Sequence, residues 1–129
     1  MRALTKIFIH AVILWLLAGP AFAGAVEDAK AAYQRGDCTS TLQILRPLAE
    51  QGDAQAQYNL GMMYDAGRWV NAADDAEAVN WYRKAAEQGY AYAYTALGIM
   101  LEEGRGVPQD YAQAMKWYHM AAEWIDSSA

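Results

Sequence analysis

The chain has 129 residues, 55% of them hydrophobic, and a formal net charge of −5. This length suits a single domain. An acidic chain without a basic cluster is a poor candidate for binding nucleic acid, because contacts to phosphate supply much of that affinity, and attraction to an anionic membrane is disfavoured for the same reason. Cys38 is the only cysteine, so no internal disulfide holds the fold.

Residues 1–23 have the pattern of a secretory signal peptide. Arg2 and Lys6 form a positive start, an apolar run follows, and small residues precede the expected cleavage site between Ala23 and Gly24. The apolar run is too short to cross a bilayer, which needs about 20 residues. We therefore predict an exported protein, periplasmic or secreted, whose mature part has no membrane span and a formal charge of −7 once Arg2 and Lys6 are removed.

The mature part, residues 24–129, reads as short helices that end at glycine or proline turns. Apolar residues recur at helical spacing, and glycine follows several of the helices, as is usual at a helix C-terminus. Asp53 is a good N-cap, and Asp74 with Glu77 has the spacing of a capping box. We expect the tail, 126–129, to fray. The predicted helices are 25–35, 39–51, 54–66, 74–88, 91–103 and 110–125.

Two stretches, 53–89 and 90–129, are copies of each other, and 24–52 forms a further helix pair before them. A shift of 37 residues pairs Gly61 with Gly98. Glycine inside a helix costs about 0.5–1 kcal/mol relative to alanine, so a recurring one indicates that a neighbouring helix comes close. Because one helix pair cannot bury its apolar face alone, stacking must supply the core. The fold class is therefore all-α, an array of antiparallel helix pairs.

The second copy carries a specific motif. It has the Leu97-Gly98 pair, the loop GRGVPQDY at 104–111 and the run WYHMAAE at 117–123. With these residues the chain resembles the Sel-one-like repeats, a branch of the tetratricopeptide repeat superfamily. The first copy departs from the pattern in its loop, where Trp69 replaces the second glycine. The resemblance implies a short right-handed α–α superhelix, a solenoid, that acts as a protein-interaction scaffold without a shared catalytic centre.

The resemblance also implies a partner-binding side. In tetratricopeptide-type arrays the first helix of each pair lines the concave side, where it would contact a protein or peptide partner. By register the residues on this side, besides Gln55, are Tyr58, Met62, Asp65, Tyr92, Thr95, Ile99 and Glu102. The alternative is that these side chains pack between the two repeats.

The last helix carries an apolar stripe of Trp117, Met120, Ala121 and Trp124. One interpretation is that the stripe folds back on its own helix pair. The other is an exposed edge that binds a partner or a second copy, which makes homo-oligomerisation or a self-assembling structural subunit an alternative function.

The mature chain offers little for catalysis. His119 is its only histidine, and the cluster Asp74, Asp75 and Glu77 is explained by capping and by the positive end of a helix dipole. We therefore predict no enzyme, no catalytic residues, no metal and no cofactor. The alternative is a cell-envelope enzyme or enzyme-associated factor acting on cell-wall material, whose activity would be lost on changing His119 or Asp75.

Overall fold

The computed structural model describes residues 24–66 and 74–129. These residues fall into two compact units, which divide between Ile44 and Leu45. The predicted signal peptide and the first loop, with Trp69, lie outside the described residues. All regular secondary structure in the described part is helical, which confirms the all-α fold class. No helix in this part is both long and apolar enough to span a bilayer.

The first unit holds a helix over residues 24–34 and the start of α2 (Cys38–Glu50). Ala29 and Ala32 are buried on the first helix. Asp37 starts α2, because its carboxylate accepts the Ser40 N–H at 3.1 Å and its carbonyl accepts the Thr41 hydroxyl at 2.7 Å. These two bonds, one to a backbone N–H and one to a side-chain hydroxyl of the first turn, fix where the helix begins.

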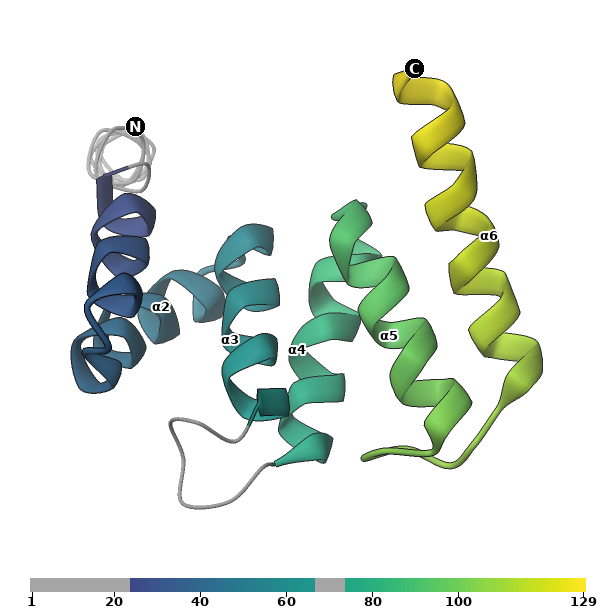
Figure 1. The fold of residues 1–129 in the computed structure, drawn as a ribbon, viewed down its shortest axis with the longest axis horizontal. Coiled ribbons are helices and arrows are strands. Elements are labelled where there is room, and N and C mark those ends of the chain that lie inside the picture. The colour runs from purple at the N-terminus through teal and green to yellow at the C-terminus, as the bar shows by residue number, and fades with distance from the viewer. Residues whose placement is uncertain (1–23, 67–73) are drawn as a thin grey trace, which may run out of the picture. The chain divides into compact units, whose positions relative to one another are not determined.

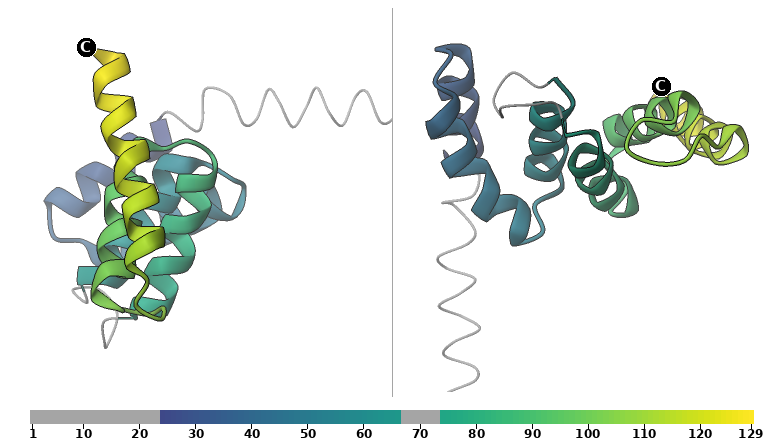
Figure 2. Two further views of the ribbon diagram at one scale, coloured as in Figure 1. Left: turned by 90° about the vertical axis from the view of Figure 1, so that its right-hand side faces the viewer. Right: turned by 90° about the horizontal axis from the view of Figure 1, so that it is seen from below.

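The second unit holds the two repeats as antiparallel helices (Figures 1 and 2). Helix α3 packs against α4, α5 packs against α6, and α4 packs against α5 and so joins the two pairs. The bounds are α3 (Ala54–Ala66), α4 (Asp75–Glu87), α5 (Ala91–Glu103) and α6 (Tyr111–Ser128). The predicted alternation of short helices and turns is confirmed.

Equivalent positions of the two repeats form the core of this unit. The first helix of each repeat buries a stripe of small and apolar residues, as the helical spacing predicts. The buried pairs are Ala56 and Ala93, Leu60 and Leu97, Gly61 and Gly98, Met63 and Met100, and Tyr64 and Leu101. The internal repeat is thus a repeat of packing as well as of sequence.

The glycine inside each first helix makes room for a tyrosine of the second helix. A Cβ atom on Gly61 would lie 2.7 Å from the ring of Tyr82, and one on Gly98 would lie 2.5 Å from the ring of Tyr118. Both separations are far below van der Waals contact. The recurring glycine therefore reflects close helix packing, as predicted.

Three aspartates cap the helices of this unit. The carboxylate of Asp53 accepts the Ala56 N–H, that of Asp74 accepts the Glu77 N–H and that of Asp110 accepts the Gln113 N–H. The predicted caps at Asp53 and Asp74 are confirmed.

The last helix is longer than predicted, because α6 continues to Ser128 and does not end near residue 125, while fraying of 126–129 stays a prediction. The hydroxyls of Ser127 and Ser128 donate to the carbonyl of Trp124, at 3.0 and 2.5 Å, and the two bonds hold the last turn.

Candidate functional site: an aromatic surface

Four aromatic side chains from three helices of the second unit lie next to one another. Tyr58 lies on α3, Tyr90 is the N-cap residue of α5, Tyr92 is in the first turn of α5, and Trp124 is near the end of α6. We refer to Tyr58, Tyr90, Tyr92 and Trp124 as the aromatic surface. The helix packing brings together residues that are far apart in the sequence.

The rings of the aromatic surface form a continuous series. The ring centroids of Tyr58 and Tyr90 are 5.3 Å apart, those of Tyr90 and Tyr92 are 5.7 Å apart, and those of Tyr92 and Trp124 are 6.1 Å apart. All three pairs are tilted, which is a favourable arrangement for aromatic rings. At its inner end Tyr58 contacts the buried Tyr82, with centroids 5.7 Å apart, so the core supports the series.

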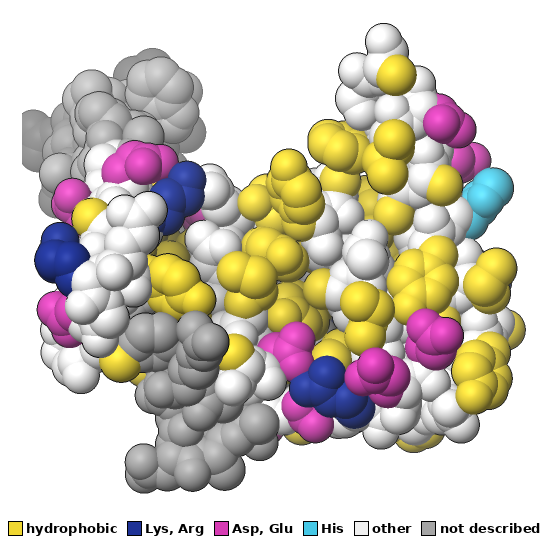
Figure 3. Space-filling view, in the orientation of Figure 1, with side chains coloured by type: hydrophobic (Ala, Val, Ile, Leu, Met, Phe, Trp, Pro, Cys, Tyr) yellow, Lys and Arg dark blue, Asp and Glu magenta, His cyan; other side chains and the backbone are white. Residues whose placement is uncertain are grey.

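The outer members of the series are open to a ligand. Tyr92 is 62% exposed and Trp124 is 44% exposed, whereas Tyr58 and Tyr90 are half-buried. Figure 3 shows hydrophobic side chains gathered over α3, α5 and α6, with acidic and basic side chains at the lower edge of these helices. Exposed aromatic rings next to one another are typical of binding surfaces.

Burial and nearby carboxylates act on the two inner tyrosines. Burial raises the pKa of Tyr58, and the charges on Tyr92 and Asp65 raise it further. Burial also raises the pKa of Tyr90, with further contributions from neighbouring tyrosines and Asp53. Both hydroxyls are therefore protonated at neutral pH and can donate hydrogen bonds to a ligand.

The fold does not require these four aromatic residues. The position equivalent to Tyr58 in the other repeat is Thr95, and those equivalent to Tyr90, Tyr92 and Trp124 are polar as well. The equivalent residues are Thr95, Asp53, Gln55 and Gln88, respectively. Because the two repeats share one packing, residues that differ between them are free to serve binding.

The structure places the other residues predicted for the concave side on the same helices. Met62 and Ile99 are equivalent to each other, and each is 39% exposed. Thr95 is exposed on α5. The predicted Tyr58 and Tyr92 are in contact, with ring centroids 6.2 Å apart.

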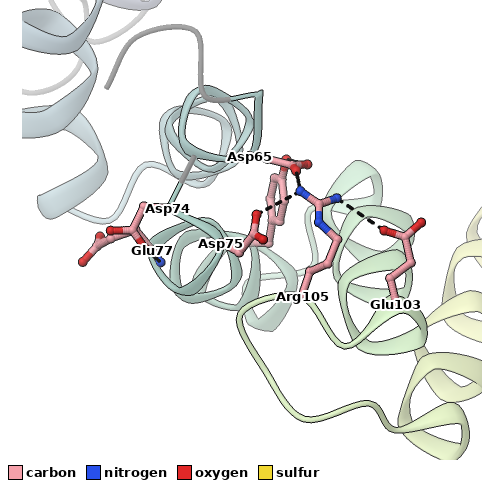
Figure 4. Close-up of polar contacts among 7 residues, drawn as sticks. Asp65, Asp74, Asp75, Glu77, Glu103 and Arg105 are labelled. Atoms are coloured by element: carbon pink, nitrogen blue, oxygen red, sulfur yellow. Dashed lines mark hydrogen bonds and ion pairs between the residues drawn. The ribbon is translucent and has the colours of Figure 1, made fainter. Parts of the chain in front are cut away.

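Asp65, predicted to contact a partner at the rim, belongs to a charge cluster around Arg105 (Figure 4). The Arg105 guanidinium pairs with Asp65 at 2.5 Å, with Asp75 at 2.9 Å and with Glu103 at 3.4 Å. The Tyr82 hydroxyl also donates to Asp65, at 3.0 Å. Bonds to Asp75 and Asp65 raise the pKa of Arg105. This cluster joins the turn of the second repeat to both helices of the first.

Glu102, the other acidic residue predicted for the rim, accepts a hydrogen bond from the Tyr118 hydroxyl at 2.6 Å. Glu102 is the repeat equivalent of Asp65, and Tyr118 is that of Tyr82. Each repeat therefore uses the same bond between its two helices.

The predicted stripe of the last helix divides into two parts. Trp117 is half-buried and stacks on Tyr94 of α5, with ring centroids 5.7 Å apart. Trp124 reaches the aromatic surface, while Met120 is 41% exposed. Trp117 thus fits the interpretation that the stripe packs on its own helix pair, whereas Trp124 joins the aromatic surface.

Helix α6 has a second exposed apolar surface, which we call the outer face of α6 and which consists of Tyr111, Met115 and Ile125. Tyr111, Met115 and Ile125 have the most exposed apolar side chains of α6, each more than 60% exposed. Comparison of the repeats identifies this face, because Met115 is equivalent to Val79, and Val79 is only 6% exposed on α4, against which α5 packs. The sequence analysis did not use that comparison.

Tyr90 and the contact of Tyr92 with Trp124 were not predicted from the sequence. Tyr90 is equivalent to the capping residue Asp53 and precedes the predicted helix 91–103, so helical spacing gave no direction for its side chain. Its side chain makes no cap bond, which leaves the ring free to join the aromatic surface.

The polar residues that were considered for catalysis have other contacts in the described part of the chain. His119 pairs with Glu123 at 3.3 Å on the surface of α6, where both side chains are mostly exposed. Asp75 is bonded to Arg105, and Asp74 caps α4. Within 24–66 and 74–129, His, Cys, Asp and Glu form no group of three that could hold a metal ion. The arrangement is suited to binding.

The fold and the aromatic surface define an α-helical repeat protein with a surface suited to a ligand. The family model of the Sel1 repeat matches residues 54–90 and 91–123, and the chain belongs to the Sel1 repeat family. No match is found among curated proteins.

Solved structures agree with this family. A protective antigen of uropathogenic Escherichia coli strains with an SLR fold is 44% identical over 68% of the chain, with a TM-score of 0.66. A Sel1 repeat protein from Oxalobacter formigenes is 33% identical over 78%, with a TM-score of 0.70. The chain spans 19% and 39%, respectively, of the lengths of these two proteins.

Cysteine-rich protein B of Helicobacter pylori shares the fold at 24% identity, with a TM-score of 0.61. The matched part covers 74% of the chain and 87% of that protein. The predicted solenoid of antiparallel helix pairs is therefore confirmed.

Proposed function

We propose that the chain is an exported interaction module that holds a protein or peptide partner on its aromatic surface. The observation that carries the proposal is that all four members of this surface stand where the two repeats differ. Tyrosine and tryptophan dominate the energetics of protein interfaces, because a rigid ring buries a large area at little cost in entropy. The Sel1 repeats support binding over catalysis, because they form a scaffold. The described part of this scaffold has no metal cluster.

Affinity capture tests the proposal. The purified protein is immobilised and exposed to cell-envelope extract of the source organism, and captured proteins are identified by mass spectrometry. A variant with Tyr92→Ala and Trp124→Ala should lose the partner, because truncating central aromatic residues of an interface costs about 2 kcal/mol or more each.

The control variant carries Met115→Ser and Ile125→Ser on the outer face of α6, where the side chains are at least as exposed. This variant should retain the partner. The proposal is wrong if both variants capture the same proteins as the unmodified chain.

Export is the second part of the proposal, and the pattern of residues 1–23 supports it. Protein isolated from the periplasm or the medium should begin at Gly24. An intact N-terminus on protein found only in the cytoplasm would contradict export.

Self-association through the outer face of α6 is a second candidate function. Met115 is 64% exposed and Ile125 62% exposed, on a helix with Ala114 as its one buried residue. Light scattering over a range of concentrations should show a dimer or larger species that Met115→Glu dissociates. A monomer at every concentration rules this candidate out.

A further inference from the structure

The charges of the second unit restrict the kind of partner that the aromatic surface can take. Residues 45–129 contain twelve Asp and Glu against six Lys and Arg. Arg105 is paired with acidic residues, Arg46 donates to the hydroxyl of Tyr64, and Lys84 lies on an aromatic ring. These three cations are already engaged, so the unit presents an excess of negative charge to a partner.

We propose that the aromatic surface binds a cationic segment of the partner, with arginine or lysine side chains lying on the rings of Tyr92 and Trp124. This inference rests on the proposed function and names the chemistry of the partner. The faces of these exposed rings carry negative charge from the π electrons, and a cation over such a face is attracted. Charge complementarity therefore selects a cation.

Carboxylates at the inner end of the surface strengthen this preference. Asp53 caps the start of α3 and Asp65 lies in its last turn, so two carboxylates flank Tyr58 on this helix. A segment that crosses the surface from Trp124 to Tyr58 therefore meets open rings first and negative potential further in. Asp65 is shared with Arg105, which leaves Asp53 as the better probe of this effect.

The chain contains an example of the proposed contact. The ammonium group of Lys84 lies 4.5 Å from the ring centroid of Trp81. This pair lies within α4 and joins an ammonium group to an indole ring, as we propose for a partner lysine on Trp124. The aromatic surface offers further rings to a partner, without a lysine or arginine of the chain on them among the described residues.

Peptide binding measured by fluorescence anisotropy tests the inference. The probes are short unstructured peptides of one length and spacing, in which a repeated residue is arginine, lysine, glutamine or glutamate. We expect the arginine and lysine peptides to bind and the glutamine and glutamate peptides not to bind. Affinity should fall as salt is added, since exposed charges are screened.

Substitutions locate the bound cation. Tyr92→Ala and Trp124→Ala should each weaken arginine-peptide binding by roughly two- to thirty-fold, whereas Tyr92→Phe keeps the ring and should retain binding. Asp53→Asn keeps the helix cap and removes one charge, so it should weaken binding. Glu77→Gln, the matched change near the start of α4, should leave binding unaltered.

Each outcome decides the inference. Equal binding of all four peptides, or binding that survives the loss of both rings, overturns it. If an envelope partner is captured through Tyr92 and Trp124 but its bound segment is neutral or acidic, the proposed function stands and the cationic preference is wrong. Circular dichroism of each variant checks that the helices are intact. If the alanine variants unfold, arginine-peptide binding is compared between Tyr92→Phe, which should retain it, and Asp53→Asn, which should weaken it.

Discussion

The ring of Tyr82 occupies the space that a side chain on Gly61 would need, with the closest ring atoms 2.7 Å from the position of the missing Cβ. Tyr82 is 2% exposed and cannot move away into solvent. Its hydroxyl is also bound by Asp65. Glycine and tyrosine thus set the distance between α3 and α4 together.

Gly61→Ala should destabilise the protein even though alanine is the better helix former. Forcing a methyl group into a filled space costs about 1–3 kcal/mol, which exceeds the gain in helix propensity. Gly98→Ala should behave alike against Tyr118. Urea unfolding checks both, with the exposed Thr95→Ala on α5 as the control. A Gly61→Ala variant as stable as the unmodified chain would contradict the close packing.

Arg105 should stabilise the contact between the repeats in a manner that depends on salt. Arg105→Ala removes the pairs with Asp65 and Asp75, which are about one-third exposed. We expect a loss of about 1 kcal/mol, because pairs with this much solvent contact contribute modestly. Arg105→Lys should recover only part of it, since lysine lacks the planar group that bridges two acids.

Unfolding in low and high salt distinguishes this pairing from simple packing. The loss caused by Arg105→Ala should shrink at 1 M salt. Lys30→Ala, which removes an exposed pair with Glu27, is the control and should change the unfolding free energy very little. A loss that is the same at both salt concentrations argues against an electrostatic role.

Tyr118 should make the fold sensitive to alkaline pH. Burial, followed by the hydrogen bond to Glu102, raises the pKa of Tyr118 from 10.0 to about 12. Because the folded protein holds this proton more tightly than the unfolded chain, the contribution is complete below pH 10 and is lost as the pH rises toward about 12.

Tyr118→Phe keeps the ring and removes the titrating hydroxyl. The fall in unfolding free energy above pH 10 should therefore be smaller in this variant, as measured by urea unfolding at a series of pH values. Tyr111→Phe on the exposed start of α6 is the control. An unchanged pH profile in Tyr118→Phe would show that the hydroxyl is not coupled to folding.

Gln57 should be the most sensitive polar residue of the core. Its side chain is 5% exposed, donates to the carbonyl of Ala49 at 3.1 Å and accepts from Gln88 at 2.7 Å. Gln57→Leu keeps the volume but removes this bond and leaves the Ala49 carbonyl with the Gly52 N–H as its remaining donor. We expect a loss of about 1 kcal/mol, the usual contribution of one hydrogen bond. Thermal unfolding checks this, with the exposed Gln43→Leu on α2 as the control. If Gln57→Leu melts at the same temperature as the unmodified chain, these bonds do not contribute to stability.

The packing of this protein could be predicted from its sequence because the two repeats confirm each other. Gly61 and Gly98 recur inside helices, where glycine is unfavourable, so a close neighbour was the remaining reason for them. The caps at Asp53 and Asp74 follow from local chemistry that needs no tertiary structure. The caps depend on short spacing along the chain, and the glycines depend on comparison of the two repeats.

The contacts that join different helices could not be predicted in the same way. Tyr92 meets Trp124 because of the angle at which α6 crosses α5, and that angle depends on all the side chains between them. Arg105 lies in a turn, so helical periodicity gives no direction for its side chain. Its bonds to Asp65 and Asp75 depend on how one repeat is placed on the next.

The outer face of α6 would allow further repeats to be added to the helical array. Val79 on α4 and Met115 on α6 hold equivalent positions, and the first is buried where α5 follows while the second is open. A further repeat joined after Glu123, which is equivalent to Glu87 at the end of α4, would meet the outer face of α6 in register. Burying Met115 alone would add about 1.5–3 kcal/mol. The chain is in this sense a modular building block, which protein engineers could extend without redesigning α3, α4 or α5.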